Sequence, residues 1–382
     1  MMKKLIPFLF LILLVSCGEK GSSEKTESGN ILENLTYSVD TVMVDPGEEL
    51  INLSMGLFVS DVSKDSNYLY LFSQPEYSLT VINLDLLNIE KKIVFEKEGP
   101  NGIGAYIMDF KVLPDEKFMF ASFGSAAVFD ANSIKLEDIS LKTNEHPELA
   151  VEDGQDLNFQ INRGTDERYL YSLPGNFMEV ERDLAVIDRS TKSAKLIDIP
   201  ALDNTGKFSI SFFSDGMREI SLEEYYLDEY QGFLYLSSSV TSDLYRYDFQ
   251  NDSLQLFSFP ITVSPKEKTE FPKSEVSSKL EQQEESQKVH SQIAFNELMW
   301  DETRRLFFKI GSITKPSDSP DVPAIFSVFL YAFDTNMELV GETLVNDLKS
   351  IPESAFFKDG KLWSYVNVDD ELGFAVFTFD FN

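Results

Sequence analysis

The sequence repeats one supersecondary pattern six times, and this repetition constrains the fold more than any other feature. Each repeat contains a short segment rich in aromatic and apolar residues: YLYLFS at 68, FMFASF at 118, YLYSLP at 169, FLYLSS at 233, LFFKIG at 306 and LWSYVN at 362. Aromatic and β-branched residues separated by polar turns favour strands over helices. Four predicted strands in each unit of about 50 residues are typical of the blades of a β-propeller.

A second predicted strand follows each of these segments, and its fifth residue is Asp or Asn in five of the six units. The six positions are Asn83, Asp130, Asp188, Asp248, Asp334 and Thr378. A short Asp or Asn side chain can accept a hydrogen bond from the backbone N–H two residues further on, which begins a turn. We therefore interpret this series as turn chemistry repeated once per unit, in preference to a catalytic or metal-binding series.

The two ends of the chain are expected to meet in one blade. The sixth unit stops after its third strand, while the alternating segment LTYSVDTVMVD at 35–45 precedes the first unit. Pairing these ends would remove two exposed sheet edges. The expected fold class is therefore all-β: a six-bladed β-propeller of four-stranded blades over residues 31–382, closed by the N-terminal strand. The polar stretch 262–290 is predicted to be an insertion, either disordered or partly a short exposed helix.

Residues 1–16 have the features of a secretory signal peptide. Two lysines precede an apolar run at 5–15 that is too short for a comfortable membrane span. The run ends in Leu-Val-Ser-Cys, and Cys17 is the only cysteine in the chain. This motif resembles the bacterial lipobox, so we expect Cys17 to be lipidated and residues 17–30 to be a flexible tether. The alternative is an ordinary secreted protein in which Cys17 is lost or idle. The expected location is the cell envelope, lipid-anchored in the outer membrane.

The acidic composition argues against negatively charged partners. The chain has 64 acidic and 33 basic residues and a net charge of −31. Such a charge opposes binding to nucleic acid or to an anionic membrane surface. We expect no nucleic-acid partner, and membrane contact only through the lipid anchor. Because the acids are spread along the chain, they are also typical of a well-solvated surface.

The lipobox, the YSVDTVMVD strand and the stretch EGPNGIGAY at 98–106 together resemble a known family. These features are similar to those of lipoproteins of Bacteroidetes-type bacteria that carry a domain of unknown function with a TolB-like six-bladed propeller. The resemblance spans essentially the whole mature chain, although only the Gly-rich stretch is distinctive. It implies a fold and a location, and it implies no activity.

The long connections between predicted strands fall on one face of the expected ring. They comprise 96–105, 143–155, 174–182, 201–219, 262–290 and 311–325. Insertions in repeat folds tend to collect on the binding face. Our candidate ligand-binding residues are therefore three loop residues and four residues on strands that could face a central channel. They are Asn101, Gly102 and His146 in loops, and Asp109, Asn158, Glu223 and Asn296 on strands.

No catalytic motif is present in the sequence. It lacks HExxH, GxSxG and any cysteine cluster, and GPNGIG at 99–104 fits neither the P-loop nor the Rossmann pattern. The first hypothesis is a binding or scaffolding module whose long-loop face takes a protein, peptide or glycan. The second is a metal-assisted hydrolase or lactonase with a divalent cation such as calcium, held by carboxylates in the channel. A propeller hosts both kinds of function, so the fold does not decide between them.

Overall fold

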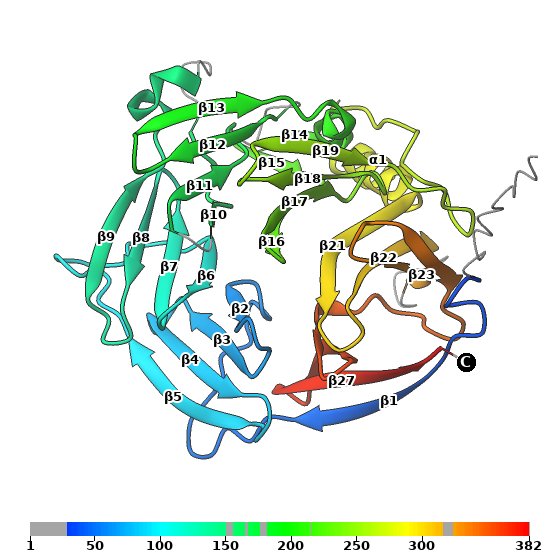
Figure 1. The fold of residues 1–382 in the computed structure, drawn as a ribbon, viewed down its shortest axis with the longest axis horizontal. Helices are drawn as coiled ribbons and strands as arrows, with labels where there is room; N and C mark the ends of the chain where they lie inside the picture. The colour runs from blue at the N-terminus through cyan, green and yellow to red at the C-terminus, as the bar shows by residue number, and fades with distance from the viewer. Residues whose placement is uncertain are drawn as a thin grey trace, which may run out of the picture.

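The computed structural model describes residues 29–149, 156–164, 167–175, 182–214, 216–315 and 324–381. In this part of the chain the strands form six four-stranded antiparallel sheets and one smaller sheet of three strands. Figure 1 shows the four-stranded sheets arranged as a ring around a common centre. The fold is therefore all-β, with each four-stranded sheet built from consecutive strands except at the chain ends.

The first three sheets follow the chain in order. The first contains β2 (Ser60–Val62), β3 (Tyr68–Ser73), β4 (Ser78–Asn83) and β5 (Asn88–Val94). The second contains β6 (Asp109–Leu113), β7 (Lys117–Ser122), β8 (Ser125–Phe129) and β9 (Lys135–Ser140). The third contains β10 (Asn162–Arg163), β11 (Tyr169–Ser172), β12 (Leu184–Asp188) and β13 (Ser193–Ile197). The first-numbered strand of each sheet lies nearest the centre of the ring (Figure 1).

The other three sheets repeat this arrangement. The fourth contains β16 (Tyr225–Tyr230), β17 (Phe233–Ser238), β18 (Leu244–Asp248) and β19 (Ser253–Phe257). The fifth contains β21 (Ile293–Asp301), β22 (Leu306–Lys315), β23 (Ile325–Phe333) and β24 (Leu339–Leu344). The last contains β25 (Glu353–Lys358), β26 (Lys361–Val368), β27 (Glu371–Asp380) and, at its outer edge, β1 (Thr36–Met43).

The apolar core lies between neighbouring sheets. The second strand of each unit is buried on both faces, as the aromatic segments predict. Rings from adjacent sheets meet across the interface: Phe72 of β3 contacts Phe120 of β7 with 5.2 Å between ring centroids. Tyr235 of β17 contacts Phe307 of β22 at 5.1 Å. Such edge-on and tilted ring pairs stabilise the packing of one sheet on the next beyond the burial of apolar area.

The turn chemistry predicted from the Asp and Asn series is confirmed at five positions. The Oδ1 atoms of Asn83, Asp130, Asp188, Asp248 and Asp334 each accept hydrogen bonds from backbone N–H groups two to four residues further on. The sixth residue, Thr378, lies inside β27 and begins no turn. In five of the six four-stranded sheets the series therefore terminates the third strand by a local interaction that needs no ligand.

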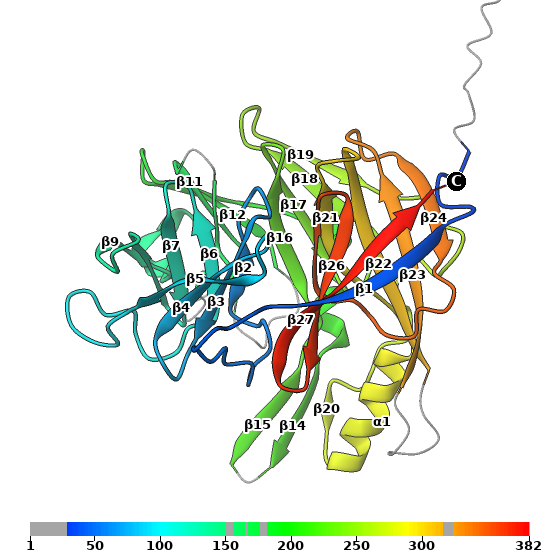
Figure 2. The same cartoon turned by 90° about the horizontal axis from the view of Figure 1, so that it is seen from below.

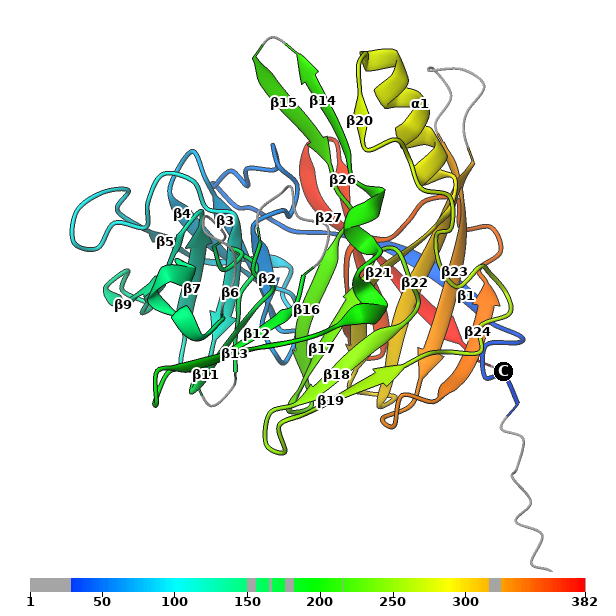
Figure 3. The same cartoon turned by 90° about the horizontal axis from the view of Figure 1, so that it is seen from above.

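Two segments predicted as connections form additional structure. The stretch 201–219 contains the hairpin of β14 (Ile210–Ser214) and β15 (Met217–Ser221). The stretch 262–290 contributes β20 (Glu275–Val276), which pairs parallel with β14, and the helix α1 (Lys279–His290). Of the two alternatives given for 262–290, the short helix is the one that forms, whereas the hairpin was not expected. We call β14, β15, β20 and α1 the accessory module; it projects from one face of the ring (Figures 2 and 3).

Short 3-10 helices complete the description. They span Thr143–Glu145, Pro147–Leu149, Pro200–Leu202 and Thr205–Phe208. The described residues include no helix long and apolar enough to cross a membrane. The predicted signal peptide and Cys17 lie outside the described residues.

Candidate functional site

The strands nearest the centre of the ring carry a cluster of charged side chains, which we call the central cluster. Asp61 is on β2, Asp109 and Lys111 are on β6, Asp228 is on β16 and Glu297 is on β21. All five residues are half-buried. Four different sheets therefore place charge around the same axis.

The groups of the central cluster change one another's ionisation. Burial, with a smaller contribution from the charge of Asp61, raises the pKa of Asp109 and of Asp228 to about 6. Burial, together with the charge of Asp228, raises the pKa of Glu297 to about 7. Lys111 acts in the opposite direction, because its positive charge favours the ionised form of each carboxyl.

Lys111 is the cation of the central cluster. Burial alone would disfavour its charge, but the attraction of the surrounding carboxylates is larger in sum and raises the pKa of Lys111. Among the residues that the structure describes, no three His, Cys, Asp or Glu side chains are grouped so that they could hold a metal ion. Lys111 is thus a counter-ion within the central cluster, and the described residues provide no grouped ligand set for the divalent cation of the second hypothesis.

A second lysine, Lys309 of β22, is buried beside this cluster. It is 1% exposed, and its Nζ has no hydrogen-bond partner among the described residues. The Nζ lies 5.4 Å from the centroid of the Phe295 ring. Burial lowers the pKa of Lys309 to about 7, against the attraction of Asp243 and Asp228. Lys309 is therefore an ammonium group held in an apolar setting with little compensation.

The accessory module is attached to the ring by a buried ion pair. Lys268 Nζ lies 2.6 Å from Glu223 Oε1, and the two side chains are 2% and 9% exposed. The Ser239 hydroxyl donates to the other oxygen of Glu223 at 2.5 Å. The backbone N–H of Lys268 donates to the carbonyl of Val240. The start of the 262–290 insertion is thereby fixed to the loop that follows β17.

An apolar cluster completes the attachment. Its buried members come from the hairpin, from β20, from α1 and from the ring: Phe208, Ile210, Phe212, Val240, Val276 and Val289. Ser278 caps α1, because its hydroxyl accepts the N–H of Glu281, and the Glu281 carboxylate accepts the N–H of Ser277. The helix is thus capped at its N-terminus and packed on one side, which gives the module a defined position.

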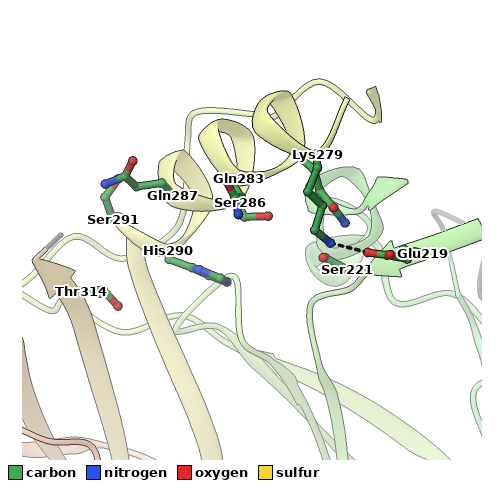
Figure 4. Close-up of a pocket in the computed structure, with 10 residues that line it drawn as sticks. Glu219, Ser221, Lys279, Gln283, Ser286, Gln287, His290, Ser291 and Thr314 are labelled. Atoms are coloured by element: carbon green, nitrogen blue, oxygen red, sulfur yellow. Dashed lines mark hydrogen bonds and ion pairs between the residues drawn. The ribbon is translucent and has the colours of Figure 1, made fainter. Parts of the chain in front are cut away.

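A groove of about 470 Å³ separates α1 from β15. Ten side chains line it: Glu219, Ser221, Lys279, Gln282, Gln283, Ser286, Gln287, His290, Ser291 and Thr314. Figure 4 labels all of them except Gln282 and shows how the labelled side chains lie. All ten are polar. The six helical members recur at intervals of three or four residues and so share one face of α1. The long-loop face therefore contains a polar depression built from the helix, the hairpin and the end of β22.

The groove and the start of the described chain lie at opposite ends of the fifth sheet. The N–H of Ile31 donates to the carbonyl of Val340 in β24. That end of the sheet contains the Phe307–Phe333 pair, whereas Thr314 pairs with Phe326 at the other end. Figure 2 shows the same relation, with the first residues of β1 and the accessory module on opposite sides.

The candidate residues predicted from the sequence do not form one site. Asp109 belongs to the central cluster, and Asn296 lies in the irregular part of β21 next to Glu297. Glu223 pairs with Lys268 in the accessory attachment. The side chain of Asn158 accepts the N–H of Gln160. His146 ends a 3-10 helix, and its Nδ1 is buried without a hydrogen-bond partner among the described residues.

Asn101 and Gly102 have structural roles in the connection between the first two sheets. Asn101 Oδ1 accepts the N–H of Lys135 at 3.1 Å. A Cβ on Gly102 would lie 2.7 Å from the Cα of Glu98, closer than packing allows. The loop donates its N–H groups inward, from Ile103 to Glu96 and from Gly104 to Lys97. These hydrogen bonds fold the loop on itself rather than forming a cradle for a phosphate.

The comparisons with known proteins establish the family. The model of a domain of unknown function, DUF4221, matches residues 28–344. The chain belongs to the DUF4221 family. No curated protein matches the sequence.

Solved structures support the fold. A DUF4221 member from Bacteroides vulgatus ATCC 8482 is 13% identical, with a TM-score of 0.64 over 91% of this chain and 98% of that one. A Bacteroides fragilis NCTC 9343 protein described as exported is 9% identical, with a TM-score of 0.51 over 90% of this chain and 95% of that one. The β-propeller domain of Myceliophteria thermophila Cps50 (Swd1) is 7% identical, with a TM-score of 0.40 over 88% and 99%. At these identities the first two similarities concern the fold alone.

Proposed function

We propose that this DUF4221 protein is an envelope lipoprotein whose ring is a closed six-bladed β-propeller and whose accessory module binds a partner. The six four-stranded sheets and the antiparallel pairing of β1 with β27 over eight residue pairs support the closed propeller. The signal-like segment and Cys17 at the lipobox position support the anchor. Lipidation at Cys17 would tether the ring to the outer membrane through the polar residues 17–30.

One observation carries the binding function: two separate connections build a second structural unit on one face of the ring. The hairpin comes from the connection after β13, and α1 comes from the connection after β19. The buried ion pair of Lys268 with Glu223 fixes this unit to the ring. Ring closure does not require either connection to be long, so the extra residues serve something other than the packing of the blades.

The anchor and the accessory module fit this role together. The described chain begins beside β24, at the end of the fifth sheet opposite the groove. A membrane tether attached there leaves the accessory module facing away from the lipid. A partner in the envelope, whether a protein, a peptide or a glycan, would then reach the module without obstruction by the membrane. The metal-assisted hydrolase remains a hypothesis from the sequence that no observation in the described residues favours.

Photo-crosslinking in living cells tests the binding function. A photoreactive amino acid replaces Met217, which is exposed on β15, or Asn336, which is exposed in the turn between β23 and β24. We expect irradiation to join the protein to an envelope component from position 217 and not from position 336. Equal crosslinking from both positions, or none from position 217, would contradict a binding role for the accessory module.

Fractionation tests the anchor. We expect the wild-type protein to sediment with outer membranes and to incorporate a labelled fatty acid. The Cys17→Ala variant should be unlipidated and should leave the membrane fraction, because no other anchor is expected. Unchanged fractionation of this variant would refute lipid anchoring at Cys17 without affecting the proposal for the accessory module.

A further inference from the structure

The groove between α1 and β15 has hydrogen-bonding groups that the protein leaves unused. Within the described ranges, the side chains of Gln283, Ser286 and Gln287 on α1 make no hydrogen bond to the protein. The same holds for Ser221 at the end of β15 and Thr314 near the end of β22. The two carboxamides each supply donors and an acceptor, and each hydroxyl supplies both. Three structural elements thus direct both kinds of group into one depression.

The ten described residues that line the groove carry no net charge, although the chain as a whole has a charge of −31. Lys279 Nζ lies 2.6 Å from Glu219 Oε2, so the one cation and the one carboxylate of the lining form an ion pair. Burial, followed by the nearby charge of Lys268, lowers the pKa of His290, which leaves its imidazole neutral at pH 7. Among these ten residues, a charged ligand would find no opposite charge that is not already paired.

The helix that carries most of the lining is fixed by buried contacts with the rest of the protein. Val289 of α1 is buried in the apolar cluster that contains residues of the hairpin and of β20. The Lys268–Glu223 pair fixes the chain that leads to the helix. Groups whose positions are set by packing lose less conformational entropy when they bind a ligand. The groove is therefore organised before any ligand enters.

We propose that this groove binds an uncharged oligosaccharide through hydrogen bonds from α1, β15 and β22. This inference rests on the proposed binding function and names the ligand of the accessory module. A volume of about 470 Å³ is within the range of small-molecule sites, and a saccharide of a few residues presents hydroxyls on every side. Carboxamides and hydroxyls that both donate and accept match such a ligand.

The composition of the lining separates a saccharide from the other classes of ligand. A peptide would bring apolar side chains, and none of the ten lining residues that the structure describes is apolar. A phosphorylated ligand would need unpaired lysines or arginines. The described lining contains no aromatic ring on which a sugar could stack, and we expect affinity in the range of about 10 μM to 1 mM.

Isothermal titration of the soluble chain that starts at residue 30 tests the inference. The neutral probes are maltohexaose, cellohexaose, xylohexaose and chitohexaose. A hyaluronan hexasaccharide serves as the charged probe, and a hexaserine peptide with blocked ends serves as the uncharged peptide. We expect at least one neutral saccharide to bind with a stoichiometry of one. We also expect it to bind about tenfold more tightly than hyaluronan and the peptide.

Three variants locate the binding. Gln283→Ala and Gln287→Ala each remove one carboxamide from an exposed side chain, and each should weaken saccharide binding about tenfold. Glu284→Ala is the matched control, because Glu284 is exposed on α1 outside the groove and should leave the affinity unchanged. Equal melting temperatures of the four proteins would show that the folds are comparable.

The outcomes are distinct from those for the proposed function. Binding of no neutral saccharide at about 1 mM would overturn the glycan inference, as would binding that both glutamine variants leave intact. Preferential binding of the hexaserine peptide would also overturn it. If crosslinking from position 217 still captured an envelope component in any of these cases, the accessory module would remain a binding unit for a ligand of another class.

Discussion

Replacing Lys309 with methionine should stabilise the protein, and the gain should depend on pH. The folded state keeps this ammonium buried, without a hydrogen bond, beside the Phe295 ring. Methionine has a similar length and flexibility but no charge, so it can occupy the same space without the desolvation cost. The substitution therefore isolates the cost of the buried charge.

The magnitude follows from the depressed pKa. A fall from the usual 10.5 to about 7 corresponds to about 5 kcal/mol at 1.36 kcal/mol per unit. We expect about 2–3 kcal/mol, because relaxation and water penetration reduce such costs and the contact with Phe295 is lost. The folded pKa lies below the unfolded one, so the cost is complete below pH 7 and disappears as the pH rises towards about 10.5.

Urea unfolding of the wild type and of Lys309→Met, at about pH 6 and about pH 9.5, measures the effect. The variant should have the higher free energy of unfolding at the lower pH, and the difference should shrink at the higher pH. Lys361→Met, on an exposed lysine of β26, is the control and should change little at either pH. A variant less stable than the wild type at pH 6, or a gain independent of pH, would refute the reasoning.

Three further substitutions test other contacts. Lys111→Met should lower the free energy of unfolding by about 3 kcal/mol near pH 8 and by less near pH 5, where protonation of the neighbouring carboxyls removes their repulsion. Urea unfolding at both pH values measures this loss, and an equal loss at both would contradict the prediction. Lys268→Ala leaves Glu223 buried and unpaired. The 262–290 segment should therefore become open to hydrogen exchange and proteolysis while the four-stranded sheets stay protected, and unchanged protection of α1 would contradict this. Gly102→Ala should lower the stability measured by thermal unfolding by about 1–3 kcal/mol. Gly29→Ala is the control and should change it little, because a Cβ there meets no other atom. Equal melting temperatures of the two variants would show that the loop around Gly102 shifts to accommodate the added methyl group.

The sheets were predictable from the sequence because each repeats a local signal. Aromatic segments identified the buried second strands, and the Asx series identified the turns that end the third strands. Both signals depend on residues close together in the chain, so one sequence suffices to find them. The hairpin of β14 and β15 was missed because SISFFSDGMREIS lies between two units and has no counterpart in the others.

The central cluster was only partly predictable. Asp109 was selected because it lies on a predicted inner strand, but Lys111, two residues later on the same face, was overlooked. Asp228, which lies within β16, was not among the candidate residues. Glu297 is displaced by a bulge in β21, which no local pattern reveals. The groove brings together Ser221, α1 and Thr314 across nearly a hundred residues, and such a contact leaves no signal in a single sequence.

The pairing of β1 with β27 has a consequence for how the chain matures. Thr36 pairs with Asp380, so one of the first strands to be synthesised finds its neighbour among the last residues of the chain. Until the C-terminal residues are made, β1 cannot pair with β27, and the sheets made earlier have no last sheet to pack against. For a chain threaded across a membrane from its N-terminus, the last sheet cannot form until the C-terminus has followed. A chain that loses only its final strand would therefore leave both ends of the ring exposed, and we expect it to be degraded by proteases.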